Sequence, residues 1–198
     1  YALKGIQLDN GSKDSVSQSY VYLQLSNALL QNGFINQAED YIQRSLNHFP
    51  QNYYAPLVKV YIDFMKNEDF DQAIDYLVQE LEKDSTRMDF LAEIGQLYYF
   101  QEKYKLAFPY YQRLDALRNQ QNLDIYKEEN LKLAVCYRSM GLTEEAARFF
   151  KSYAEACDQN KSLYKPLLLG SKYAYEGNYK KAIEQYKLFP NEGNFPFP

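Results

Sequence analysis

The chain has 198 residues, which suits one ordinary domain or one array of repeats with a buried core. Lysine and arginine number 22 against 26 aspartates and glutamates, and this net charge of −4 argues against a protein that binds the phosphate backbone of nucleic acids. A hydrophobic fraction of 46% and a charged fraction of 24% exclude a chain that is disordered throughout. The longest apolar run, Leu133 to Tyr137, is too short to cross a bilayer.

The ends of the sequence lead us to expect a piece of a longer protein. The chain begins at Tyr1 with neither a methionine nor an apolar signal segment, and it closes with the apolar sequence Phe195 to Pro198. Near its beginning, Asn10-Gly11 is a pair typical of turns. Residues 1–18 are therefore predicted to be the end of a preceding helix followed by a turn.

A similar segment of sequence then recurs five times along the chain. An alanine marks each copy, at intervals of 35, 34, 39 and 36 residues: Ala38, Ala73, Ala107, Ala146 and Ala182. A tyrosine or phenylalanine follows each alanine at a distance of three or four residues. A unit of this length predicts paired helices that stack along the chain, because one pair cannot bury its apolar face alone.

Each copy predicts two helices joined by a short turn, as the first copy illustrates. Leu25 and Leu29 lie one helical turn apart, and Gly33 is expected to end their helix. Asn36 can cap the second helix, which is predicted to run as far as Pro50. The same order of helix, turn and helix is expected in the four later copies.

The five copies resemble the tetratricopeptide repeat, a helix-turn-helix unit of about 34 residues with large apolar, small and aromatic residues at fixed positions. The first copy supplies Tyr22, Leu25, Ser26, Leu29, Gly33, Ile35, Ala38, Ile42, Ser45 and Pro50. The third supplies Leu91, Ile94, Gly95, Tyr98, Tyr104, Ala107 and Tyr111, and the fifth supplies Leu169, Gly170, Tyr173, Gly177, Tyr179, Ala182 and Tyr186. The resemblance implies an all-α fold, an α-solenoid of stacked antiparallel helix pairs wound as a right-handed superhelix.

The resemblance implies a single array, with repeats at about residues 19–52, 54–87, 88–121, 127–160 and 163–196. Several positions depart from the family pattern: Tyr61 replaces a small residue, Asn130 replaces a large apolar one, only Pro50 matches the terminal proline, and an alanine near the end of the second helix is replaced by Glu80, Leu114, Tyr153 and Phe189. The extra residues of the longest interval fall in the polar stretch 118–124, where we expect a longer loop or helix end and a bend in the array. Gly95 is expected to face Ala107 and to let the two helices of the third copy approach closely.

The sequence shows no arrangement typical of a catalytic or metal site. His48 has no second histidine as a partner, and its predicted place at the end of a helix suits the helix dipole. Cys136 and Cys157 are too few for a disulfide scaffold, and Cys136 lies among apolar neighbours typical of a buried thiol. We therefore expect a protein without catalysis, cofactor or metal. The compartment stays open, with the cytoplasm favoured.

The resemblance also implies a binding surface, because the family binds peptides on a concave face formed by the first helix of each repeat. Matching its positions to this sequence predicts the following candidates: Tyr20, Leu23, Asn27, Lys59, Ile62, Lys66, Gln96, Tyr99, Phe100, Leu131 and Arg138. Most of this face is apolar or aromatic, so hydrophobic anchors are expected to dominate. Lys59, Lys66 and Arg138 are expected to select the charge of the ligand.

One subtype of the family is argued against by the charges on this face. Chaperone adaptors of the family grip an acidic C-terminus with a clamp of lysine, asparagine and basic residues. Of the clamp positions Asn27 matches, but Asp89 and Glu93 stand where cations are required, and Leu23 stands where a lysine is required. Two acids would repel a carboxylate, so we do not expect a carboxylate-clamp chaperone adaptor.

We expect a non-catalytic protein–protein interaction scaffold that binds a peptide or helix in its concave groove, with a protein rather than a nucleic acid as partner. One alternative is a regulatory, sensor or oligomerisation module of a larger signalling protein, such as a transcriptional regulator or a cyclase-like protein. Another is self-association through the apolar tail or the open ends of the array. The sequence leaves these alternatives open.

Overall fold

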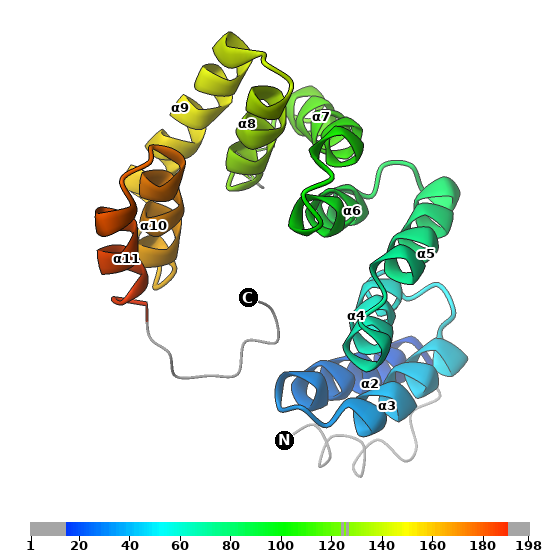
Figure 1. The fold of residues 1–198 in the computed structure, drawn as a ribbon. Helices are drawn as coiled ribbons and strands as arrows, with labels where there is room; N and C mark the ends of the chain where they lie inside the picture. Colours follow the sequence, from blue (N-terminus) through cyan, green and yellow to red (C-terminus); the bar gives the residue numbers. More distant parts are fainter. Residues whose placement is uncertain (1–14, 124, 126, 190–198) are drawn as a thin grey trace. The chain divides into compact units, whose positions relative to one another are not determined.

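In the computed structural model the described residues, 15–123, 125 and 127–189, form ten helices and no strand (Figure 1). The predicted all-α solenoid of stacked helix pairs is confirmed. The predicted turn at Asn10-Gly11 and the tail from Phe195 to Pro198 lie outside the described residues. The boundaries of the repeats within one array stay a prediction.

The helices gather into two compact units, which divide between Asp84 and Ser85. The N-terminal unit contains α2 (Ser15–Gln31), α3 (Ile35–His48), α4 (Ala55–Asn67) and α5 (Phe70–Lys83). The C-terminal unit contains α6 (Met88–Phe100), α7 (Tyr104–Gln120), α8 (Glu129–Ser139), α9 (Thr143–Gln159), α10 (Lys165–Tyr175) and α11 (Tyr179–Tyr186). Within each unit, helices that follow one another in the chain pack together, as the repeat predicts.

The turn inside each helix pair contains one residue in the left-handed region of backbone conformation. Gly33, Gly141 and Gly177 occupy it with φ between +77° and +79° in three of the turns. Glu68 and Glu102 adopt φ of +52° and +57° in the other two. Glycine is the usual residue at this position after a helix, because it lacks the Cβ that crowds a left-handed backbone. Glycine therefore indicates three of these turns in the sequence, whereas the two turns with glutamate are indicated only by their place in the repeat.

The first helix begins earlier than the sequence predicts. α2 starts at Ser15, so residues 15–18 are helical rather than part of a turn. This extension lies against α3, because the Ser15 hydroxyl donates to the carbonyl of His48 and the Ser19 hydroxyl donates to the carbonyl of Ser45 at 2.8 Å. The buried amide of Asn52 donates to Ser19 Oγ at 2.8 Å and completes the polar contact between the helices.

The core of the N-terminal unit is formed by the facing sides of α2, α3 and α4, and its buried members are Leu23, Leu30, Ala38, Ile42, Ala55, Val58 and Ile62. The small residues allow close packing, and the Ser26 hydroxyl donates to the carbonyl of Ala38 at 2.7 Å.

In the C-terminal unit, a small residue in a first helix makes room for an aromatic ring of the second. A Cβ added to Gly95 would lie 2.8 Å from Cε1 of Tyr111, and one added to Gly170 would lie 2.3 Å from Cε1 of Tyr186. Close packing at Gly95 was predicted, but the nearest atoms there belong to the Tyr111 ring rather than to Ala107. The reason is that the larger side chain fills the space that the glycine leaves.

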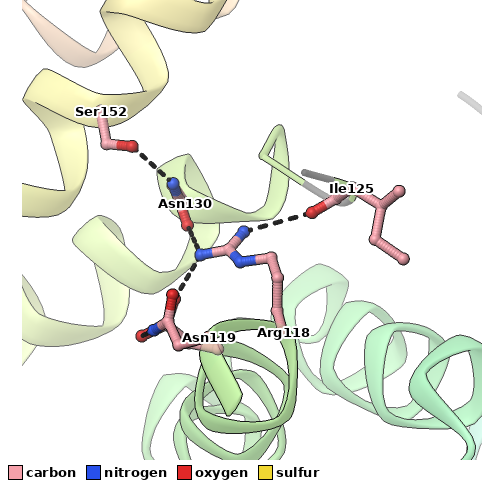
Figure 2. Close-up of polar contacts among 6 residues, drawn as sticks. Arg118, Asn119, Ile125, Asn130 and Ser152 are labelled. Atoms are coloured by element: carbon pink, nitrogen blue, oxygen red, sulfur yellow. Dashed lines mark hydrogen bonds and ion pairs between the residues drawn. The ribbon is translucent and has the colours of Figure 1, made fainter. Parts of the chain in front are cut away.

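α7 continues to Gln120 and α8 begins at Glu129, so the polar stretch predicted as a longer loop or helix end begins within α7. A buried arginine, Arg118, links the segment between α7 and α8 to the helices on either side (Figure 2). Its guanidinium donates to the carbonyl of Ile125 at 3.5 Å and to Oδ1 of Asn130 at 2.9 Å, and it forms an ion pair with Asp115. Asn130 in turn donates to the hydroxyl of Ser152 at 3.0 Å.

These contacts explain why Asn130 departs from the family pattern. A large apolar residue at this position in α8 would leave the buried Arg118 with one partner fewer. The amide instead accepts from α7 and donates to α9, so it joins three helices through hydrogen bonds.

Candidate functional site

The first helices of the three pairs in the C-terminal unit, α6, α8 and α10, lie on the inner side of the arc that this unit forms (Figure 1). The second helices, α7, α9 and α11, lie on its outer side. α6 and α8 are in direct contact, and Arg138 of α8 donates to the carbonyl of Tyr175 in α10, so the first helices are linked one to the next. Their side chains that point away from the second helices therefore form one surface, which we call the inner face.

Helix α8 shows why the inner face is unusual. One side of this helix is buried in the unit through residues such as Leu133 and Cys136. On the opposite side, Leu131, Val135 and Arg138 recur at helical spacing and are only partly buried or exposed. A surface helix normally carries polar residues there, so α8 is apolar on both sides and calls for a further contact.

The neighbouring helices carry apolar side chains in the same register. On α6 the Phe100 ring is 45% exposed, and on α10 the Leu167 side chain is 40% exposed. The inner face includes Ala92, Gln96, Tyr99, Phe100, Leu131, Val135, Arg138, Leu167, Ala174 and Tyr175, and the same repeat positions also hold the polar residues Asp89, Glu128, Ser139 and Ser171. The outer helix α9 differs, because its exposed side chains include Glu144, Arg148, Lys151 and Glu155. Exposed apolar surface of this kind typically marks an interaction site.

The tyrosine at the end of α6 is held in place by its neighbours. The ring of Tyr99 lies 5.4 Å from the ring of Tyr104 in an edge-on arrangement, and 6.4 Å from the ring of Phe100. Burial raises the pKa of the Tyr99 hydroxyl to about 12, so it stays protonated at neutral pH. Tyr99 therefore belongs to an aromatic group with Phe100 and Tyr104 at the end of α6.

The ends of α8 and α10 are joined by a stack of three planar groups. The guanidinium carbon of Arg138 lies 3.5 Å from the centre of the Tyr175 ring. The rings of Tyr175 and Phe150 are 4.3 Å apart and nearly parallel. Both terminal nitrogens of Arg138 also donate to the carbonyl of Tyr175, each at 3.3 Å. Arg138 is consequently held in one orientation on the inner face.

A second cation near the inner face is already paired. Lys132 forms an ion pair with Glu129 at 2.8 Å and donates to Oε1 of Gln96 at 2.5 Å. Burial raises the pKa of the Glu129 carboxyl, and the nearby Lys132 acts in the opposite direction. This cluster joins α6 to α8, so Gln96 and Lys132 are used within the protein.

The N-terminal unit offers less of the predicted binding surface. Leu23 is 1% exposed and Ile62 is 0% exposed, because both lie in the core where α2 meets α4. These two residues are therefore core residues rather than groove residues in this structure. Tyr20 and Asn27 remain partly exposed on α2.

The two lysines predicted to select charge both have partners in the N-terminal unit. Lys59 forms an ion pair with Asp63 on its own helix, at 2.5 Å, and lies over the ring of Tyr76. Lys66 forms an ion pair with Glu39 of α3 at 2.8 Å. A ligand carboxylate would have to compete with these pairs, so neither lysine is an unoccupied anion site.

Across the described residues, no group of three or more histidine, cysteine, aspartate or glutamate side chains is placed to hold a metal ion. His48 lies in the last turn of α3, as predicted, with its ring 5.3 Å from that of Tyr22. Cys136 and Cys157 are both buried and free, and burial raises the pKa of the Cys136 thiol to about 12. Within the same described part, no helix is long and apolar enough to span a membrane.

The comparison with known families agrees with the repeat pattern. Residues 62–122 match the family model described as tetratricopeptide repeat (TPR). This part of the chain therefore contains tetratricopeptide repeats. Proteins built from TPR units serve in general as scaffolds for protein–protein interaction, and the described helices show the corresponding solenoid fold.

Three solved structures illustrate the shared fold. PilF of Pseudomonas aeruginosa is 23% identical, with a TM-score of 0.60 over 92% of this chain and 79% of that chain. YrrB, described as a TPR protein with an unusual peptide-binding site, is 20% identical, with a TM-score of 0.54 over 94% of this chain and 89% of that chain. MamA is 18% identical, with a TM-score of 0.54 over 86% of this chain and 89% of that chain. No curated protein matches the sequence.

The structure gathers five of the predicted candidates, Gln96, Tyr99, Phe100, Leu131 and Arg138, on the inner face of the helices in the C-terminal unit. The sequence-based candidates omitted Leu167 and Tyr175 of α10. Both occupy the positions of the fifth repeat that correspond to inner-face positions of the third and fourth. Applying the same register to the fifth repeat would have found them.

Proposed function

We propose that this chain is a non-catalytic scaffold that binds a peptide or a helix of a protein partner on the inner face of its C-terminal unit. The observation that carries the proposal is the apolar outward side of α8, which continues onto Phe100 of α6 and Leu167 of α10. A bound apolar segment would remove this surface from water, which is favourable by about 25 cal/mol per Å² of apolar area.

The arrangement suits a short amphipathic segment. Side chains on α6, α8 and α10, which are linked by the α6–α8 contact and by Arg138 to Tyr175, can contact successive anchors of one ligand. Phe100, Leu131 and Leu167 supply the apolar contacts, and the Tyr175 ring, held by stacking on Phe150, lies beside them. A peptide-binding TPR protein with a similar fold, YrrB, gives the proposal a precedent.

The test first selects peptides that bind the chain and then replaces the apolar side chains of the inner face. A phage library of random peptides of about 12 residues, which as helices are ~18 Å long, is panned on the purified chain. Binding of a selected peptide is measured by fluorescence anisotropy on wild type and on Phe100→Asp, Leu131→Asp and Leu167→Asp. Each inner-face variant is expected to weaken binding at least about tenfold, because a buried apolar side chain contributes about 1.5–3 kcal/mol.

The matched control is Leu106→Asp, which places the same charge on an exposed leucine of the outer helix α7. It should bind like wild type, and circular dichroism should show unchanged helicity in all four variants. Equal losses in the control and the inner-face variants would exclude the inner face as the binding site. A partner that is a second copy of this chain would instead give a mass that rises with concentration in sedimentation, and the inner-face variants would abolish that rise.

A further inference from the structure

We propose that Arg138 binds a carboxylate of the ligand, so that the inner face selects apolar peptides with one acidic group. This inference rests on the proposed function and names the class of ligand. Its basis is a cation that is exposed, fixed in orientation and surrounded by apolar side chains.

The first observation is the placement of Arg138. It continues the stripe of Leu131 and Val135 on α8, and its guanidinium is stacked on the ring of Tyr175 from α10. A ligand that covers the apolar stripe would therefore also cover this cation. Removing an arginine from water without an anion to replace the water is costly, so a purely apolar ligand would be penalised here.

The second observation is that Arg138 has no ion pair among the described residues, whereas the other candidate cations have one. Lys59 and Lys66 pair with Asp63 and Glu39, and Lys132 pairs with Glu129. Their charges are neutralised within the protein. Of the cations considered for ligand selection, Arg138 alone keeps an uncompensated charge in the described structure.

The third observation is the direction of the free donors. A guanidinium carries five N–H groups in one plane. The Tyr175 ring covers one face of that plane, and the Tyr175 carbonyl accepts at 3.3 Å from both terminal nitrogens, which leaves further N–H groups for a ligand. Arginine binds a carboxylate through two parallel hydrogen bonds, and an orientation fixed in advance lowers the entropy cost of that contact.

The structure also offers a purely structural role for the same side chain. Arg138 donates to the last carbonyl of α10, as basic residues near helix ends commonly do. That role predicts a change in stability when Arg138 is replaced, but no dependence on the charge of the ligand. A test must therefore change the ligand as well as the protein.

The experiment uses two peptide libraries panned on the wild-type chain and, in parallel, on Arg138→Gln. One library is fused to phage through its C-terminus, so any carboxylate comes from aspartate or glutamate. The other is synthesised with free C-termini. We expect wild type to select one acidic position at a fixed spacing from apolar anchors, and Arg138→Gln to select the same anchors without the acid. The library that yields the acid shows whether a side chain or a C-terminus supplies it.

Affinity measurements on one selected peptide complete the test. Replacing the acidic group by its amide is expected to weaken binding to wild type about tenfold, or about 1.4 kcal/mol, and to leave binding to Arg138→Gln unchanged. The affinity of the acidic peptide for wild type should also fall more steeply with added salt than its affinity for Arg138→Gln. Arg148→Gln is the matched control, since Arg148 also lies over a ring, that of Phe149, but on the outer helix α9.

Three outcomes overturn the inference. Selected peptides with apolar anchors and no preferred acid would leave the proposed function intact and remove the role of Arg138. An acid that is selected equally by Arg138→Gln would place the carboxylate elsewhere. Failure to select any peptide that depends on Phe100 or Leu167 would reject the binding surface itself. The comparison of acid and amide peptides on wild type decides the question even if Arg138→Gln does not fold.

Discussion

The polar link between α7, α8 and α9 makes a prediction that separates this fold from a standard apolar repeat core. Arg118 and Asn130 are both buried, and their hydrogen bond of 2.9 Å joins α7 to α8. Replacing one partner leaves the other with one buried hydrogen-bonding group unsatisfied, whereas replacing both removes the donor and the acceptor of that bond together. The two substitutions should therefore compensate each other.

The single variants are Arg118→Met, which keeps the length of the side chain, and Asn130→Leu, which restores the large apolar residue of the family pattern. Arg118→Met removes the donor to Oδ1 of Asn130 and the cation paired with Asp115, whose carboxylate keeps only the Asn119 amide among these contacts, so we expect a loss of about 2–4 kcal/mol of unfolding free energy. Asn130→Leu removes a partner of Arg118 and of Ser152, and should cost about 1–3 kcal/mol.

The double variant is expected to lose at least about 1 kcal/mol less than the sum of the single losses, because the donor and the acceptor of the Arg118–Asn130 hydrogen bond disappear together. Urea unfolding followed by far-UV circular dichroism measures all four proteins. Losses that add within about 0.5 kcal/mol would refute the reasoning, since independent sites behave in that way.

The other predictions concern packing and pH. Gly95→Ala should lower the unfolding free energy by up to about 2 kcal/mol, because its Cβ would meet the buried Tyr111 ring and this overpacking, which costs about 1–3 kcal/mol, outweighs the gain of about 1 kcal/mol in helix propensity. A stabilised variant in urea unfolding would show that the ring moves aside freely. Raising the pH from about 9 to about 12 should destabilise the chain, since burial raises the pKa of Cys136 and of Tyr99 to about 12, above their values of about 8.5 and 10 when unfolded. Each group stabilises the folded state fully at pH values below its pKa in the unfolded chain. This contribution to the unfolding free energy is lost as the pH rises toward its pKa in the folded chain, by up to about 1.4 kcal/mol per pH unit. Cys136→Ala should therefore show a shallower fall in urea unfolding over this range, and an unchanged slope would contradict the assignment.

Much of the architecture could be predicted from the sequence because it depends on local properties. The regular alanines and aromatic residues predicted paired helices, and Gly33, Gly141 and Gly177 occupy turns that need a left-handed backbone. The need for a residue without a side chain at Gly95 was also predictable, although the group that fills the space was not. These features depend on the preferences of single residues and on spacing within a few helical turns.

The candidate site was predicted only in part, because periodicity identifies the face of a helix but not what covers it. Leu23 and Ile62 occupy inner-face positions in the repeat pattern, yet the contact between α2 and α4 buries them. Lys66 likewise becomes paired because Glu39, 27 residues earlier in the chain, lies beside it. Such contacts join residues that are distant in sequence.

The sequence by itself determined that this chain folds as stacked helix pairs, because an apolar stripe repeated at helical spacing can be buried only by a neighbouring pair. Tertiary structure alone decided which polar groups find partners. It satisfied Asn130 through Arg118 and Ser152, and it placed Arg138 on a tyrosine ring with no carboxylate beside it among the described residues. The physical reason is that burial and pairing depend on distances in space, which the order of residues fixes only after the helices have packed.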